Sequence, residues 1–215
     1  MYSLTGAYDE GFFKSNYDDT WPMAKFISPL LKEYFSLGRV LDLGCASGHY
    51  IKAFSDCGVV AIGIEGSEKA MAIAVCDPEF IHFLDLREKQ YIVKENTMDM
   101  VMSVEVAEHI EEEFVDIYVH NLTSPKAKYI YMTAAPPGQG GHFHVNCQPQ
   151  EYWINKIEEQ GYKHHPEHKE EINKWLDVRC ECYFVHEHDD SKCEKQFIPN
   201  WFPGNLMVFE KEKYE

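Results

Sequence analysis

The chain has 215 residues and carries 36 acidic residues against 20 Lys and Arg, for a formal net charge of −16. With 45% hydrophobic residues, it is long and apolar enough for one globular domain with a sizeable core. A protein that binds DNA or long RNA needs a basic footprint, so the acidic balance favours a small-molecule substrate over a nucleic acid.

Residues 1–38 precede the first predicted strand and are rich in aromatic side chains. Apolar residues recur at helical spacing from Trp21 onward, with a candidate cap at residues 19–20 and Pro22 in the first turn. We expect a helix packed on the edge of a sheet. The alternative is a cap over a ligand site, in which Tyr8 and Trp21 would touch the ligand.

The segment Val40–Leu43 is a short apolar run, typical of a strand buried on both faces of a parallel sheet. It leads into a turn of small residues, Gly44, Ala46 and Gly48, and then into a helix beginning at His49. This succession holds nucleotide-type ligands at the carboxyl edge of an α/β sheet. The small residues let the backbone approach the ligand, and the start of the helix offers free N–H groups.

A second apolar strand, Val59–Ile64, follows about twenty residues after the turn and ends on Glu65. A carboxylate at that place can accept both hydroxyls of a ribose. Together, the glycine turn and the acidic end of the next strand indicate a nucleoside-binding site.

Strands and helices then alternate as far as residue 135, which favours a parallel sheet with right-handed crossovers. We expect strands at residues 80–84, 99–105 and 128–133, with helices at Ser67–Val75 and Glu111–Leu122. Residues 136–149 are too rich in glycine and proline at their start for a regular element, so they form a loop at the carboxyl edge. A helix follows from about Pro149 to Gly161.

The last third has weaker patterns. We expect a short strand from Tyr162, a charged helix at Pro166–Leu176, an extended or helical connector at Arg179–Val185 and a last strand at Asn205–Phe209. The domain prediction is one unit, residues 1–215, made of an N-terminal cap (1–38), a cofactor-binding core (39–161) and a C-terminal part that completes the sheet and the substrate side (162–215).

The segment Asp42-Leu-Gly-Cys-Ala-Ser-Gly48 resembles the D-x-G-x-G-x-G motif of class I S-adenosylmethionine-dependent methyltransferases, with Ala46 in place of the middle glycine. The resemblance covers roughly residues 35–160. It implies a Rossmann-like α/β fold: a seven-stranded, mostly parallel sheet with helices on both faces and an antiparallel last strand. It also implies methyl transfer to a hydroxyl or amine of a small molecule.

The same resemblance implies where S-adenosylmethionine would bind. Glu65 would hold the ribose, Asp85 with Leu86 would flank the adenine, and residues 103–105 would line the floor near the sulfur. The cofactor-binding residues implied are Asp42, Gly44, Ala46, Gly48, Glu65, Gly66, Ser67, Asp85, Leu86, Ser103, Val104 and Glu105.

A hydroxyl acceptor must lose a proton, and a neutral histidine can accept it. His109 follows the fourth strand, while His142 and His144 lie in the loop after the fifth. The phase of the loop leaves these two open, and the resemblance favours His144. Glu105 would lie close to the sulfonium or orient His109; alternatively, His109 only caps or packs against the next helix.

Two metal sites are possible. The first resembles the divalent-metal set of small-RNA 2′-O-methyltransferases and some ubiquinone-pathway O-methyltransferases, and its residues are Glu105, Glu108, His109 and His144. Similar residues also occur in such enzymes without a metal. The second has residue types that suit zinc, at Cys180, Cys182, His186, His188 and Cys193. Its C-x-C spacing is less typical of zinc, so reduced cysteines are favoured there.

The seven cysteines are odd in number and spread along the chain, which indicates reduced thiols. With no apolar run of membrane-spanning length and no recognisable signal peptide, we expect a cytoplasmic protein without a membrane partner. The oligomeric state stays open. Two alternative functions are a nicotinamide dehydrogenase, which would lack its G-x-G-x-x-G pattern, and a methyltransferase-like binding module without turnover.

Overall fold

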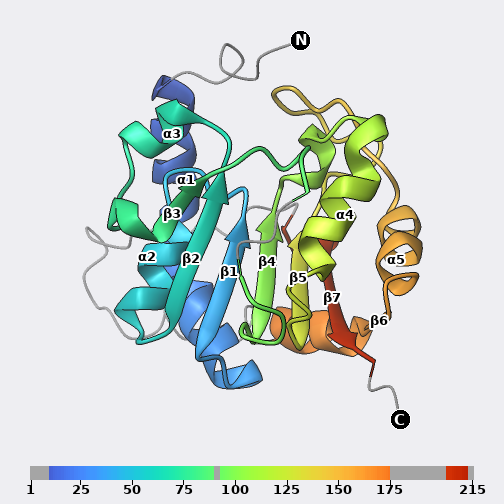
Figure 1. The fold of residues 1–215 in the computed structure, drawn as a ribbon. Helices are drawn as coiled ribbons and strands as arrows, with labels where there is room; N and C mark the ends of the chain where they lie inside the picture. Colours follow the sequence, from blue (N-terminus) through green and yellow to red (C-terminus); the bar gives the residue numbers. More distant parts are fainter. Residues whose placement is uncertain (1–9, 90–92, 175–201, 213–215) are drawn as a thin grey trace, which may run out of the picture.

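The computed structural model describes residues 10–89, 93–174 and 202–212. Its centre is a seven-stranded sheet in the order β3-β2-β1-β4-β5-β7-β6 (Figure 1). The strands are β1 (Arg39–Leu43), β2 (Val60–Glu65), β3 (Ile81–Phe83), β4 (Met100–Val104), β5 (Tyr129–Thr133), β6 (Tyr162–His164) and β7 (Leu206–Lys211). Strand β7 is antiparallel to its neighbours β5 and β6, and the other pairs are parallel. The predicted fold class is confirmed.

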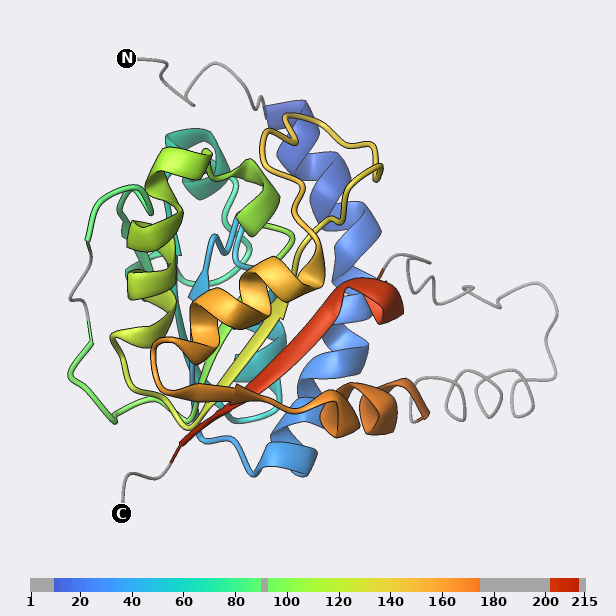
Figure 2. The same ribbon diagram turned by 90° about the vertical axis from the view of Figure 1, so that its right-hand side faces the viewer.

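The helices cover both faces of this sheet. They are α1 (Glu10–Phe35), α2 (His49–Asp56), α3 (Glu68–Ala72), α4 (Val115–Thr123), α5 (Gln150–Glu158), a helix at residues 166–174 and the short α7 (Phe202–Asn205). Figure 2 shows α1 on one side of the sheet and α4 on the other. Short 3₁₀ turns precede β3 (Pro78–Phe80) and α4 (Glu112–Phe114), and a third follows β4 (Ala107–His109).

The two faces of the sheet bury separate apolar clusters, because successive side chains of a strand point to opposite sides. Val40 packs into the cluster beneath α1 and α2, whereas its neighbour Leu41 packs into the cluster beneath α4 and α5. The continuous apolar run of β1 is therefore the pattern of a strand covered on both sides.

Helix α1 corrects one prediction. It begins at Glu10, well before the expected cap at residues 19–20, and it contains both Pro22 and Pro29. Proline removes a helical hydrogen bond but does not end the helix here, because buried side chains such as Ile27 and Leu31 hold α1 against α2 and the sheet. Pro22 therefore lies inside the helix and not in its first turn.

Helix α3 is shorter than predicted. Ser67 caps it as expected, since its hydroxyl accepts a hydrogen bond from the Ala70 N–H. The helix ends at Ala72 rather than Val75, whose N–H instead donates to the Ser47 carbonyl at 2.9 Å. The chain after α3 is thus held on the glycine turn.

Several predictions fall outside the described residues: Tyr8, the connector at Arg179–Val185 and the zinc set of Cys180, Cys182, His186, His188 and Cys193. The cysteines within the described ranges, Cys45, Cys57, Cys76 and Cys147, are free thiols. None of the helices in the described part of the chain has the length and apolar character needed to span a bilayer.

Gly63, in the middle of β2, is expected to tolerate no side chain. A Cβ atom there would lie 2.5 Å from the Cys45 sulfur and 2.5 Å from the Ile51 Cδ1. We expect Gly63→Ala to lower the free energy of unfolding by about 1–3 kcal/mol, as measured by urea denaturation. The control is Gly204→Ala in α7, where nothing lies within 4 Å of the added atom. An equal effect of both substitutions would contradict the steric explanation.

Candidate active site

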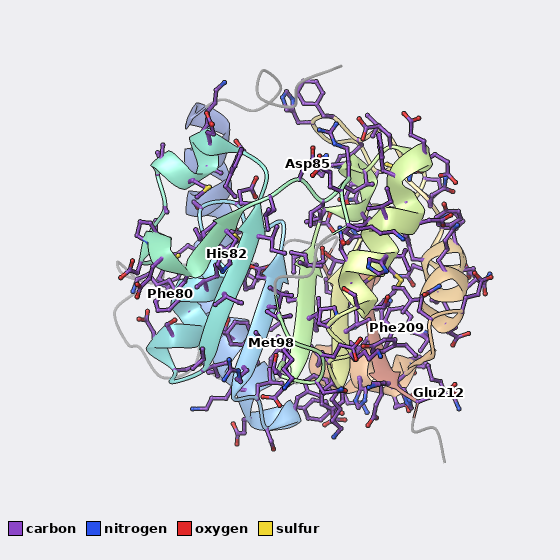
Figure 3. The ribbon with its side chains drawn as sticks, viewed as in Figure 1. Phe80, His82, Asp85, Met98, Phe209 and Glu212 are labelled. Carbon is purple, nitrogen blue, oxygen red and sulfur yellow. The ribbon has the colours of Figure 1, made fainter. Side chains whose placement is uncertain are left out.

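A cavity of about 410 Å³ lies at the carboxyl edge of the sheet, where the strand order reverses between β1 and β4. Such a reversal leaves a crevice in which α/β proteins bind their ligands. Asp85 lies at this edge, at the opposite end of the sheet from Met98 (Figure 3). A larger cavity of about 520 Å³ opens between Pro125 and Tyr162, and it is lined by none of the predicted site residues.

Most of the predicted site residues line the first cavity. They are Asp42, Gly44, Ala46, Glu65, Gly66, Ser67, Asp85, Leu86, Val104, Glu105, His109, His142 and His144. Gly48 is the last residue of the turn and faces Cys76, and the Ser103 hydroxyl is buried in the core, where it donates to the Leu43 carbonyl and accepts from Tyr118. Neither of these two residues is part of the described cavity wall.

The glycine turn is built from left-handed backbone. Gly44, Ala46 and Gly48 have φ angles of 77°, 48° and 78°. At Gly44 a Cβ atom would lie 2.6 Å from a methyl group of Val106, so only glycine fits. Ala46 adopts the same left-handed region despite its side chain, and its N–H donates to Glu65 Oε2 at 2.9 Å.

Glu65 ties the turn to the next loop. Its Oε2 accepts from the Ala46 N–H and its Oε1 accepts from the Ser67 N–H at 2.8 Å. Burial raises its pKa, while these backbone hydrogen bonds act in the opposite direction. Each carboxylate oxygen can accept a second hydrogen bond, so the side chain can also receive two hydroxyls of a ligand in the cavity.

Asp42 lies at the base of the same wall with its side chain almost fully buried. Its Oδ2 has no hydrogen-bond partner among the described residues. Burial, followed by the nearby Glu65, raises its pKa to about 8. A buried acceptor atom without a partner beside a cavity is the counterpart of a ligand's donor group.

Asp85 is positioned by an ion pair at the rim. Its Oδ2 accepts from the Arg87 guanidinium at 2.6 Å, and this hydrogen bond lowers the pKa of the carboxyl. Arg87 also lies 3.7 Å from Glu111, so its position is set from two sides. Leu86, between Asp85 and Arg87, is buried.

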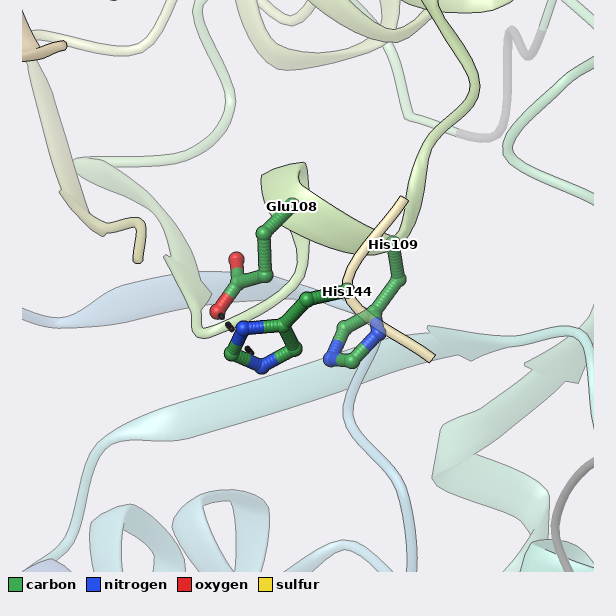
Figure 4. Close-up of side chains that lie close together, drawn as sticks. All are labelled: Glu108, His109 and His144. Carbon is green, nitrogen blue, oxygen red and sulfur yellow. Dashed lines mark ion pairs between the residues drawn. The ribbon is translucent and has the colours of Figure 1, made fainter. Parts of the chain in front are cut away.

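The far end of the cavity holds a cluster of Glu108, His109 and His144 (Figure 4). One ligand atom from each lies within 4.8 Å of the others. The Glu108 side chain is fully buried, and its carboxylate oxygens make no hydrogen bond of ordinary geometry to described residues. Its Oε1 lies 3.9 Å from the His144 Nε2. Burial, followed by the charge of Glu105, raises the pKa of Glu108.

Backbone carbonyls orient both imidazoles. The Nδ1 of His109 lies 3.0 Å from the Phe143 carbonyl, and the Nδ1 of His144 lies 3.3 Å from the Gln139 carbonyl. A carbonyl only accepts, so in the neutral form of either ring the proton belongs on Nδ1 and Nε2 is the basic nitrogen. Burial lowers the pKa of His109 to about 4, which keeps that ring neutral.

Glu105 borders this cluster, where its charge helps to raise the pKa of Glu108. It is the first residue after β4 and has a φ angle of 52°, unusual for a side chain of its size. Its Oε1 accepts from Asn205 and its Oε2 accepts from Gln139. Of the four residues predicted as a metal set, Glu108, His109 and His144 bring their ligand atoms together, and Glu105 is not part of that group.

Sequence reasoning missed part of the wall. Thr20 and His49 line the cavity and lie 3.1 Å apart between Oγ1 and Nε2, whereas the expected Trp21 is not among the described lining residues. His49 directly follows the glycine turn, so its position in the sequence could have identified it as a lining residue. Gln139 also lines the cavity; the sequence placed its loop at this edge of the sheet but did not single out this residue.

Comparison with known proteins gives a clear family. A family model described as a methyltransferase domain matches residues 17–168. No curated protein sequence matches this chain.

Solved structures share the fold at low identity. A sugar N-methyltransferase from Streptoalloteichus sp. ATCC 53650 is 12% identical with a TM-score of 0.56, covering 88% of this chain and 87% of its own. Magnesium protoporphyrin IX methyltransferase from Synechocystis PCC 6803 is 15% identical with a TM-score of 0.55, covering 68% and 75%. A methyltransferase from Aquifex aeolicus is 16% identical with a TM-score of 0.55, covering 74% and 90%.

Proposed function

Because this chain belongs to the methyltransferase domain family and is an S-adenosylmethionine-dependent enzyme, we propose that it methylates a hydroxyl or an amine of a small molecule. The proposal depends on one observation: the 410 Å³ cavity has two chemically different ends. At one end lie the glycine turn and Glu65, which suit an adenosyl group. At the other lie His109 and His144, which suit a nucleophile that must lose a proton.

The charge of the cavity wall supports a small molecule over a nucleic acid. None of its described lining residues is a lysine or an arginine, whereas Asp42, Glu65, Asp85 and Glu105 all line it. A phosphate backbone would meet carboxylates there without a compensating cation. The acceptor should therefore be neutral or cationic at the part that enters the cavity.

Bound S-adenosylmethionine supplies a methyl group on a positively charged sulfur. The protein's residues have to position the acceptor on the far side of that methyl and remove its proton. The Nε2 atoms of His109 and His144 are the acceptors for that proton, since Nδ1 of each ring faces a carbonyl. A hydroxyl acceptor needs this base more than a neutral amine does.

The cluster also fits a divalent metal ion. Two imidazoles and one carboxylate are common ligands of manganese and zinc, and the backbone carbonyls behind both rings are the usual second layer of such a site. Glu108, His109 and His144 would hold the ion, which would polarise an acceptor hydroxyl.

Calorimetric titration with Mn²⁺ tests whether the cluster binds a metal ion. We expect binding to the parent protein and a loss of affinity of about 10–100-fold in Glu108→Gln, because the buried carboxylate is the charged ligand. His142→Ala is the matched control, since His142 lines the cavity outside the cluster. If Mn²⁺ does not bind the parent protein, the cluster acts as a base alone.

The function is tested with methyl-labelled S-adenosylmethionine and a fractionated cell extract. We expect label in the dialysable small-molecule fraction, and its transfer should require the intact cluster. Label confined to protein or nucleic acid would contradict the proposal. Binding of S-adenosylhomocysteine with no labelled acceptor in any fraction would favour the non-catalytic binding module; the dehydrogenase alternative has no support from the family match.

A further inference from the structure

Three side chains behind the cavity close a ring of hydrogen bonds. The Asn205 amide nitrogen donates to Glu105 Oε1 at 3.1 Å and to Gln139 Oε1 at 3.0 Å. The Gln139 amide nitrogen donates to Glu105 Oε2 at 3.2 Å. Both oxygens of the Glu105 carboxylate are therefore held by amide donors.

The ring joins three distant parts of the chain. Glu105 directly follows β4, Gln139 belongs to the loop after β5, and Asn205 ends α7 just before β7. Glu105 and Gln139 line the cavity, but Asn205 is 4% exposed and is not among the described lining residues. Asn205 can therefore influence a ligand only through the residues it holds.

The base of the ring is itself anchored. The carbonyl of Gly204, next to Asn205, accepts from the Gln150 amide at 2.7 Å and from the Lys169 ammonium at 2.8 Å. On the opposite side, the Glu105 N–H lies 2.9 Å from the Thr133 hydroxyl, which supports its left-handed backbone. A strained residue persists only where its surroundings hold it in this way.

The ring is also linked, through Gln139, to the His144 imidazole at the far end of the cavity. Gln139 places its side chain in the ring, and its carbonyl faces the His144 Nδ1 at 3.3 Å. A shift of Gln139 would therefore turn the His144 ring. The same loop is fastened at Val145 and Asn146, whose N–H groups donate to the Glu108 carbonyl.

We propose that Asn205 is a positioning residue for the methyl-transfer step. It holds Glu105 directly, and through Gln139 it holds the acceptor-side loop and His144 in one arrangement. This role rests on the proposed function. The glycine turn and Glu65, which we expect to carry most of the donor's binding, are not bonded to the ring, and Glu105, expected near the sulfur, is the residue that the two parts share. Loss of the ring should therefore impair transfer while leaving donor binding intact.

The test compares Asn205→Ala, Asn205→Asp and Gln139→Ala with the parent protein. Hydrogen exchange of the segment 136–149 and calorimetric binding of S-adenosylhomocysteine need no knowledge of the acceptor. Gln139→Ala breaks the ring from a surface loop without touching β7, so it keeps the test informative if the Asn205 variants fold poorly. Gly204→Ala is the control for a change in α7 beside the ring.

We expect the loop amides of Val145 and Asn146 to exchange on the order of tenfold faster in each ring variant, with the amides of β1 and β2 unchanged. The dissociation constant of S-adenosylhomocysteine should stay within about twofold. Asn205→Asp should be the most affected, since its carboxylate cannot donate and lies beside Glu105. The double variant Asn205→Ala, Gln139→Ala should resemble the single variants, because one broken bond opens the ring.

With the labelled acceptor fraction, kcat should fall about 10–100-fold while the donor KM is unchanged. Unaltered loop exchange in Asn205→Ala and Gln139→Ala would overturn the proposal, as would additive effects in the double variant. Faster exchange across the whole sheet would also overturn it, because Asn205 would then be a general structural support. Failure of methyl transfer in the parent protein concerns only the proposed function, since exchange and donor binding are read without turnover.

Discussion

Replacing Glu65 with alanine is expected to weaken the binding of S-adenosylhomocysteine by at least about 100-fold, which corresponds to about 3 kcal/mol. The substitution removes the carboxylate that we propose accepts the donor's sugar hydroxyls. It also releases the N–H groups of Ala46 and Ser67, which Glu65 now holds at 2.9 and 2.8 Å. Isothermal titration calorimetry measures the affinity directly.

Glu65→Gln separates these two roles. Its amide keeps one oxygen to accept a backbone N–H, but its NH₂ group would face the other N–H as a second donor. We expect an intermediate loss, about tenfold. The matched control is Glu68→Ala, an exposed acid three residues along the chain, which should bind the ligand like the parent protein. Tight binding to Glu65→Ala would show that the sugar is held elsewhere.

Asp42→Asn is expected to stabilise the ligand-free protein while weakening donor binding. The carboxyl has a pKa of about 8 when folded, against a value near 4 when unfolded. Between these values the folded state keeps a proton that the unfolded state releases. Stability is therefore lost as the pH rises, by up to about 1.4 kcal/mol per pH unit. An amide has no such titration, and we expect Asp42→Asn to gain on the order of 2–4 kcal/mol near pH 7.

Urea denaturation between about pH 6.5 and pH 8 isolates this contribution. His49 is buried nearby with a pKa lowered to about 4, so its own effect, a loss of stability on acidification, is confined below about pH 6.5. The difference in slope between the two proteins reports Asp42 together with its interaction with the neighbouring Glu65. Equal slopes in the parent and Asp42→Asn would contradict the assignment.

The donor half of the site was readable from the sequence because its information is local. The run at Val40–Leu43, the small residues after it and the acid that ends the next strand lie within a single strand–helix–strand unit. Their order alone places the turn and Glu65 at the same sheet edge. Ser67 was likewise recognisable as a cap, since capping depends on the next few residues.

Local patterns failed where packing decides. The start of α1 was predicted too late, because Pro22 was assigned to the first turn of the helix, whereas it lies inside a helix that begins at Glu10. The Ser103 hydroxyl is buried in the core against Tyr118, whereas Glu105, two residues later, lines the cavity. Strand alternation alone would put both on the same face, but Glu105 lies beyond the end of β4 with a φ angle of 52°, which the sequence does not reveal.

The sequence by itself therefore determined the fold class, the glycine turn and Glu65, the acid that accepts a hydrogen bond from that turn. Only the tertiary structure decided which distant residues meet at and behind the cavity: Thr20 beside His49, and Asn205 beside a carboxylate a hundred residues earlier. The reason is physical. Periodicity and turn chemistry act over a few residues, whereas such pairs arise only when β7 enters the sheet beside β5 and α1 folds over α2.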